Sequence, residues 1–343
     1  MKKLLNTIYV TSQGSYLRKE GETVVIESKE QKLLQIPVHM IEGIVCFGNV
    51  RCSPFLLGFC GERNISVSFV TESGKFLASV RGPVSGNVLL RRDQYRLADN
   101  TDTTIAVAKN IILGKMINTT VILKRAIRDH GEKINKSRIE SSISSLERLI
   151  LSIDDSKSLD ELRGKEGQGA QQYFEAFDDL ILIQKSHFAF NGRSRRPPLD
   201  NVNAVLSYLY TILSHDVRSA LESIGLDPSV GFLHRDRPGR YGLALDIMEE
   251  FRPIIADRLT LTLINRKQLQ KTHFTKSATG AVRMDEHARK TILVAYQQRK
   301  QDLIFHPYLK EEVPIGLLFY IQATLLARYI RGDIDGYPPF IWR

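Results

Sequence analysis

The sequence is poor in cysteine, with only three among its 343 residues. Cys46, Cys52 and Cys60 lack the paired CxxC spacing that holds a structural zinc ion. Free thiols of this kind are usually buried, and they persist in a reducing compartment. We therefore expect three reduced, buried thiols in a cytoplasmic protein.

Long hydrophobic runs are missing as well. The first three residues, Met-Lys-Lys, start like a signal peptide, but Asn6 and Thr7 interrupt the apolar run that follows. Near the other end, the apolar stretch 315–327 is too short to span a bilayer and contains Gln322. We expect no membrane span and no membrane partner.

Acidic residues are fewer than basic ones. The chain has 38 Asp and Glu against 48 Lys and Arg, which gives a formal net charge of +10. This excess favours anionic partners such as nucleic acid. Hydrophobic residues at 43% and charged residues at 25% are ordinary for a globular protein, and the length accommodates two domains.

The first part of the chain has the pattern of β-structure. Thr23–Ile26 is a β-branched run, and residues 65–69 alternate between apolar and polar side chains. Short strands at this spacing predict a small, sandwich-like β domain over residues 1–88.

Farther along, the apolar period becomes helical, and it predicts helices that include 201–224 and 243–266. In the segment 105–116 isoleucine, alanine and methionine recur on one face, and we place Lys109 and Lys115 off that face. We expect an α+β protein in which a linker, 89–102, joins the β domain to a larger all-α domain, 103–343, that carries the functional site.

Two carboxylates one helical turn apart are the first candidate ligands. Asp246 and Glu249 lie three residues apart, which puts both side chains on one face of a helix. Their apolar neighbours imply a partly buried helix, where an unpartnered carboxylate is costly. They could therefore bind a metal ion, or pair with Arg240 or Arg252.

Glu166 is flanked by glycines at positions 164, 167 and 169. Each glycine costs a helix about 1 kcal/mol relative to alanine, so the cluster calls for a reason. A ligand or a backbone that approaches closely would supply one. The alternative is a frayed helix start or a loop.

His234 follows the segment 231–233, Gly-Phe-Leu, and is followed by arginines. Basic neighbours favour the neutral imidazole that a metal requires. Carboxylates combined with an imidazole suit Mg²⁺ or Mn²⁺ better than structural zinc, which prefers thiolates and imidazoles.

Basic side chains gather in three clusters near these candidates. Arginine binds phosphate in a bidentate fashion, so clusters beside metal ligands predict a track for a DNA backbone. The residues are Arg193, Arg195 and Arg196, then Arg235, Arg237 and Arg240, then Arg266, Lys267, Lys271 and Lys276.

At these residues the chain resembles the CRISPR-associated integrases of spacer acquisition. The glycine-flanked glutamate leading to Tyr173-Phe174, the histidine after Gly-Phe-Leu, and the acidic pair leading into Phe251-Arg252-Pro253 are similar to that family's motifs. The order of a β domain and an α domain is similar too. The closing segment 337–343 resembles the subtype I-C branch.

The resemblance implies that Glu166, His234 and Glu249 bind a divalent metal, with Asp246 beside them as a further catalytic acidic group. It implies a metal-dependent endonuclease and integrase that joins the 3′ ends of spacer DNA into a CRISPR array by transesterification, in antiviral defence. Implied partners are double-stranded spacer and repeat DNA, a second copy of the chain, and the small adaptation subunit, CRISPR-associated protein two, in a heterohexamer. Two alternatives stay open: a metal-dependent nuclease of branched DNA in repair, and a DNA-binding scaffold without catalysis.

Overall fold

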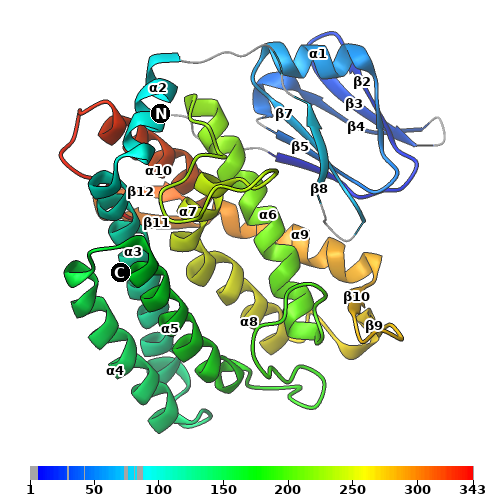
Figure 1. Ribbon diagram of the computed structural model, residues 1–343. Coiled ribbons are helices and arrows are strands. Elements are labelled where there is room, and N and C mark those ends of the chain that lie inside the picture. The colour runs from blue at the N-terminus through cyan, green and yellow to red at the C-terminus, as the bar shows by residue number, and fades with distance from the viewer. Residues whose placement is uncertain are drawn as a thin grey trace. The chain divides into compact units, whose positions relative to one another are not determined.

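The computed structural model describes residues 7–28, 31–41, 43–72, 76–80, 82 and 88–342. They fall into two compact units that divide between residues 87 and 88 (Figure 1). Strands dominate the first unit and helices the second, so the expected α+β class is confirmed.

Two four-stranded sheets make up the N-terminal unit as far as the structure describes it. One has the order β1-β5-β7-β8 and the other β4-β3-β2-β6. Apolar residues of both sheets share one core, as a sandwich requires. The bounds are Thr7–Val10 (β1), Tyr16–Glu20 (β2), Thr23–Ser28 (β3), Gln31–Pro37 (β4), Val38–Met40 (η1), Gly43–Phe47 (β5), Arg51–Cys52 (β6), Ser66–Val70 (β7) and Phe76–Val80 (β8).

A helix that we did not anticipate, α1 (Pro54–Glu62), belongs to this unit. Strands β5 and β7 pair in parallel, and parallel neighbours need a crossover connection, which α1 supplies. Ser53 caps the helix by accepting the Leu56 N–H at 3.1 Å, and a proline follows at the first helical position. The three cysteines are free, and Cys46 and Cys60 are buried in the shared core.

The second unit is helical, with two short hairpins added. Its elements are Val88–Asp99 (α2), Thr101–His130 (α3), Lys136–Ser152 (α4), Ile153–Asp155 (η2), Leu159–Phe177 (α5), Asp178–Leu180 (η3), Asn201–Ile224 (α6), Gly242–Phe251 (α7), Arg252–Asp257 (η4), Arg258–Asn265 (α8), Lys271–His273 (η5), Phe274–Lys276 (β9), Val282–Met284 (β10), Glu286–Gln301 (α9), Leu303–His306 (β11), Glu311–Pro314 (β12) and Ile315–Ile330 (α10). The hairpins are antiparallel pairs, β9 with β10 and β11 with β12.

The segment 89–102, expected to be a linker, is instead helical. It forms α2 and the start of α3, and Leu90 is buried. Gln94 donates from Nε2 to the carbonyls of Asp227 and Val230 at 2.8 and 2.9 Å. Through these tertiary hydrogen bonds, α2 holds the loop that leads to His234. The composition of the segment did not indicate this role.

Helix α3 runs through the middle of the second unit. It is long and apolar enough to span a membrane by length and composition, yet 56% of its most apolar window is buried inside the protein. It packs against α4, α5 and α7 (Figure 1). Its apolar character is therefore explained by its place in the core.

We expected one helix over 243–266, and the structure divides it with a π-turn, η4. Pro253 has no N–H to donate to the carbonyl four residues earlier, and the helix widens at that point. Such turns are common at functional sites, and this one places Arg252 beside Glu249.

Glu250 is wholly buried and holds the C-terminal segment. It accepts hydrogen bonds from the Tyr337 hydroxyl at 2.6 Å, the Phe340 N–H at 2.7 Å and the Gln322 amide at 3.0 Å. Burial raises its pKa to about 8, although these donors lower it. Glu250 is thus a neutral anchor at pH 7.

Candidate metal and DNA-binding site

The structure brings two of the predicted ligands together around one lysine. Glu166 comes from α5 and Glu249 from α7, and the ammonium of Lys115, on α3, contacts both carboxylates. The distance from Lys115 Nζ to Glu249 Oε2 is 2.7 Å. Three helices that are distant in sequence therefore meet at one cluster of charge.

His234, the third predicted ligand, is oriented by Asp246. Its Nδ1 lies 2.6 Å from Asp246 Oδ1, and the same carboxylate accepts the backbone N–H groups of Phe232, Leu233 and His234 at 2.6 to 3.0 Å. Because a carboxylate accepts, Nδ1 is the donor and Nε2 keeps its lone pair for a ligand. Both oxygens of Asp246 are committed to this loop, so Asp246 positions His234.

Two glycines make this arrangement possible. A Cβ at Gly231 would lie 2.6 Å from Asp246 Oδ2, and one at Gly242 would lie 2.8 Å from the carbonyl oxygen of Ser229. Both are closer than side-chain atoms tolerate. The close approach of the loop to the start of α7 therefore depends on glycine at both positions, a role that we did not assign from sequence.

Glu249 is nearly surrounded by positive charge. Arg252 Nη1 lies 2.8 Å from Oε1, opposite the contact with Lys115. Burial of Glu249 raises its pKa, but Arg252, Lys115 and His234 lower it more, so the net pKa lies well below its usual value. The carboxylate is ionised, as metal ligation requires. Its pairing with Arg252 was the alternative that sequence left open.

The donor set fits a hard divalent cation. Glu249 Oε2 is buried and accepts no hydrogen bond of good geometry from the residues that the structure describes. A carboxylate oxygen held only by the ion pair with Lys115, with a second carboxylate on the same ammonium, is what Mg²⁺ or Mn²⁺ would satisfy, and His234 Nε2 would be a further ligand. No three acidic, histidine or cysteine side chains stand in a ready-made chelate within the described ranges. Lys115 lies between the two carboxylates.

Our prediction placed Lys115 off the apolar face of α3, and this was wrong. It lies seven residues, or two helical turns, after the buried Ala108, which puts it on the core face of α3. Burial lowers its pKa, and Glu249 and Glu166 raise it more, so the ammonium stays charged. A lysine at a core position of an apolar helix was the signal that could have identified it.

A group of buried polar side chains packs against Arg252. Its guanidinium lies 5.0 Å from the centroid of the Tyr210 ring, and the Tyr210 hydroxyl donates to Asp257 Oδ1 at 2.6 Å. Burial raises the pKa of Asp257 to about 6, while its tyrosine partners lower it. This group fixes the direction of Arg252 toward Glu249.

The arginines of the first cluster differ in burial and in what they contact. Arg193 is half-buried and donates to Asn203 Oδ1 at 2.7 Å and to Ser207 Oγ at 3.0 Å, so it ties the chain to α6. Arg195 is exposed and lines a cavity together with Lys115, Glu166 and Arg252. Arg196 is exposed beside it.

The other two clusters differ in their distance from the ligands. Arg235 and Arg237 are exposed next to His234, and Arg235 pairs with Asp160 at 2.8 Å. Arg240 is partly buried, which lowers its pKa, as does the nearby Arg237. Arg266 and Lys267 are exposed past the end of α8, about 25 Å along the helix axis from Glu249.

The glycines around Glu166 lie inside α5, so this segment is neither a loop nor a frayed end. A Cβ at Gly169 would meet Met116 Cε at 2.8 Å, which explains that glycine by helix packing. No atom of the described chain lies within 4 Å of a Cβ at Gly164 or Gly167. These two leave bare backbone on the exposed side of the helix.

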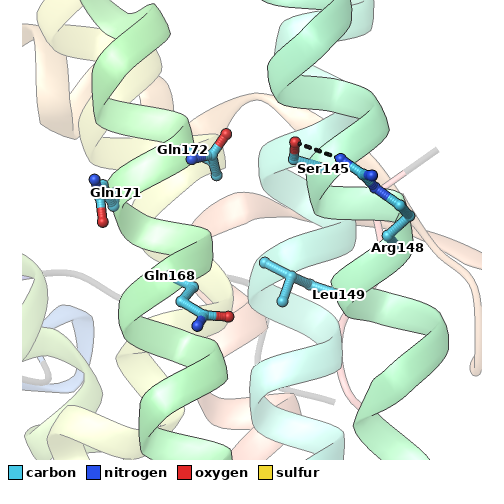
Figure 2. A pocket seen from close by; sticks show the side chains of 6 residues that line it. All are labelled: Ser145, Arg148, Leu149, Gln168, Gln171 and Gln172. Atoms are coloured by element: carbon cyan, nitrogen blue, oxygen red, sulfur yellow. Dashed lines mark hydrogen bonds between the residues drawn. The ribbon is translucent and has the colours of Figure 1, made fainter.

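A hollow of about 310 Å³ between α4 and α5 is separate from this site (Figure 2). Gln168 follows Glu166 by two residues, and at about 100° per residue it points to nearly the opposite side of the helix. The hollow is lined by Ser145, Arg148, Leu149, Gln168, Gln171 and Gln172.

Comparison with known proteins gives one consistent result. The family model described as CRISPR associated protein Cas1 matches residues 8–298. A CRISPR-associated endonuclease Cas1 from Chlorobaculum tepidum is 54% identical over 343 residues and is covered in full, as is this chain. Another from Rhodospirillum rubrum is 49% identical over 347 residues, again with full coverage of both chains.

The fold agrees with this match. A solved CAS1 protein from Thermotoga maritima superposes with a TM-score of 0.80 at 23% identity, over 95% of this chain and 97% of the other. Together with the matched relatives, these observations show that the chain belongs to the Cas1 family of CRISPR-associated endonucleases.

Proposed function

We propose that this chain is a divalent-metal-dependent DNA endonuclease and integrase that joins the 3′ ends of spacer DNA into a CRISPR array by transesterification. The observation that carries the proposal is the meeting of Glu166 and Glu249 on the Lys115 ammonium, together with a His234 ring that Asp246 orients. Exposed arginines next to that cluster supply the charge that a DNA backbone needs.

Glu166, His234 and Glu249 would hold Mg²⁺ or Mn²⁺. When bound, such an ion polarises a scissile phosphate and favours ionisation of an attacking hydroxyl or water. The 3′-hydroxyl of a spacer end as nucleophile gives joining, and water gives cleavage.

The remaining site residues would orient the metal ligands or neutralise the charge of the DNA backbone. Asp246 holds the His234 ring through Nδ1, which leaves Nε2 available to a ligand, and Arg252 holds Glu249. Arg195, Arg235 and Arg237 would contact phosphates close to the reacting one, and Arg266 and Lys267 would contact the backbone farther along. Contacts of this kind predict salt-dependent binding with little base preference.

Joining two spacer ends requires two such sites. We therefore propose a homodimer that assembles with CRISPR-associated protein two into a heterohexamer on spacer and repeat DNA in the cytoplasm. Membership of the Cas1 family supports this assembly. Assignment to subtype I-C is part of the same proposal and is tested by finding which CRISPR repeats the protein accepts.

The direct test is covalent joining of labelled DNA. The chain, its small partner, a labelled spacer duplex and a repeat-containing plasmid are incubated with Mn²⁺, and labelled plasmid is the expected product. His234→Ala should lower the joining rate by at least about 10³-fold, because the site loses a ligand that no neighbour replaces. His130→Ala, at the exposed end of α3, is the matched control and should join normally.

Other outcomes would decide against the proposal. Cleavage of branched DNA without any joining would favour a repair nuclease. DNA binding with neither reaction would favour a scaffold.

Replacing Gly167 by alanine separates stability from DNA contact. An exposed helical glycine with open space around it should gain about 0.5–1 kcal/mol of unfolding free energy on this change. If DNA approaches the bare backbone of α5, the added methyl group should weaken DNA affinity about threefold to tenfold. Chemical unfolding and fluorescence anisotropy measure the two effects. Higher stability with unchanged affinity would show that DNA does not approach Gly167.

A further inference from the structure

Lys115 occupies the centre of the ligand cluster. Its ammonium contacts Glu166 and Glu249, whose side chains are 27% and 3% exposed, and its own side chain is 13% exposed. A single monovalent cation therefore stands where the two carboxylates would share a divalent one.

The contact with Glu249 is electrostatic rather than a well-formed hydrogen bond. Lys115 Nζ lies 2.7 Å from Oε2, yet that oxygen accepts no hydrogen bond of good geometry from the described residues. Arg252 Nη1 forms a second ion pair, at 2.8 Å, with Oε1 of the same carboxylate. Of the two cations on Glu249, only Lys115 also contacts Glu166 among the described residues, so it stands where an ion shared by both carboxylates would bind.

Charge balance limits what this cluster can accept. Glu166 and Glu249 are balanced by Lys115 and Arg252, so the four side chains in direct contact are neutral together. A divalent cation added with Lys115 in place would leave two net positive charges in a partly buried site, which is costly. A DNA phosphate nearby would offset part of that charge.

A second position that the Lys115 ammonium could take lies next to the first. Lys115, Glu166, Arg195 and Arg252 line one cavity, and Arg195 is exposed at its side. A lysine ammonium carries three donors and no acceptor, which suits a phosphate oxygen as well as a carboxylate. A phosphate beside Arg195 would therefore attract Lys115 away from the two carboxylates.

We propose that Lys115 occupies the divalent-cation position in the metal-free protein and moves to a DNA phosphate when metal binds, so that metal and DNA bind cooperatively. This inference rests on the proposed function, because it assumes that the cluster takes a divalent metal and DNA. It adds a device that discourages metal binding at the site until DNA is present.

The test measures Mn²⁺ affinity by isothermal titration calorimetry, with and without a spacer duplex whose 3′ ends are dideoxy-terminated and cannot be joined. Without DNA, Lys115→Met should bind Mn²⁺ about tenfold or more tightly than the unmodified chain. DNA should tighten Mn²⁺ binding about tenfold for the unmodified chain and less than about twofold for the variant. By linkage, Mn²⁺ should tighten DNA binding by the same factors.

Two further variants guard against misreading. Lys115→Arg keeps the charge and should retain weak Mn²⁺ binding without DNA, even if Lys115→Met unfolds. Lys109→Met removes a lysine from the periphery of the same helix, where it donates to the Asp154 carbonyl at 2.6 Å, and should behave like the unmodified chain.

The outcomes separate this inference from the proposed function. Equal or weaker Mn²⁺ binding by Lys115→Met, or an unmodified chain whose Mn²⁺ affinity ignores DNA, overturns the role of Lys115 even when joining occurs. Strong coupling in a chain that joins no DNA leaves Lys115 in its role and overturns the integrase. Absence of Mn²⁺ binding in every variant overturns both.

Discussion

Glu249→Gln should abolish DNA joining and destabilise the fold at the same time. The change removes a negatively charged ligand, so we expect joining to fall by at least about 10³-fold. It also leaves Lys115 and Arg252 in a buried site without their shared carboxylate. Breaking one side of such a cluster costs about 3–5 kcal/mol of unfolding free energy.

The loss of stability should depend on pH. The pKa of Glu249 in the folded chain lies below its ordinary value, so its stabilising effect is present above about pH 4.5 and is lost as the pH falls through the lowered pKa. The difference between the unmodified chain and Glu249→Gln should therefore be full at pH 7 and shrink below about pH 4.5. Urea unfolding at a series of pH values measures it.

The adjacent residue provides a matched control. Glu250 is equally buried, but its raised pKa, about 8, makes it neutral at pH 7, and its partners are Tyr337, Phe340 and Gln322. Glu250→Gln exchanges one neutral group for another and should leave joining unchanged. Equal losses from both substitutions would show that the effect of Glu249→Gln comes from disturbance of α7 and not from loss of a ligand.

Local signals predicted the helices well where caps and apolar period agree. We expected a helix over Asn201–Ile224, and α6 has these bounds. Asp200 caps its start, and Gly225, with φ of +95°, ends it. Where the deciding contacts are tertiary, local signals failed. Gln94 donates a hydrogen bond to a loop more than 130 residues away, and no feature of the segment 89–102 indicates that partner.

The candidate site, too, could be predicted from the sequence only in part. Motif resemblance singled out Glu166, His234 and Glu249, and the structure places Glu166 and Glu249 on one ammonium and His234 near Glu249. The ammonium of Lys115 was not anticipated, because its face on α3 was assigned from too few positions. Nor was the dependence of the loop on Gly231, since a close approach between residues 231 and 246 exists only in three dimensions.

Asp246→Asn should separate positioning from ligation. The carboxylate accepts from the His234 ring and from three backbone N–H groups, and an asparagine has only one oxygen to accept with. Its amide would donate to Nδ1, which moves the ring proton to Nε2 and removes the lone pair that a metal needs. We expect Mn²⁺ affinity to fall about 10- to 100-fold. Stability should fall by about 1–3 kcal/mol.

A second buried aspartate tells these two effects apart. Asp216 accepts from Lys300 at 2.8 Å and from Tyr296 at 2.9 Å, away from the ligand cluster. Asp216→Asn should therefore lose stability but keep its Mn²⁺ affinity, measured by the same titration. If Asp246→Asn also keeps its Mn²⁺ affinity and loses only stability, the hydrogen bond to His234 does not set the ring for ligation. The metal would then be held by the two glutamates without an oriented histidine, and the geometry of the loop would have to be explained by folding alone.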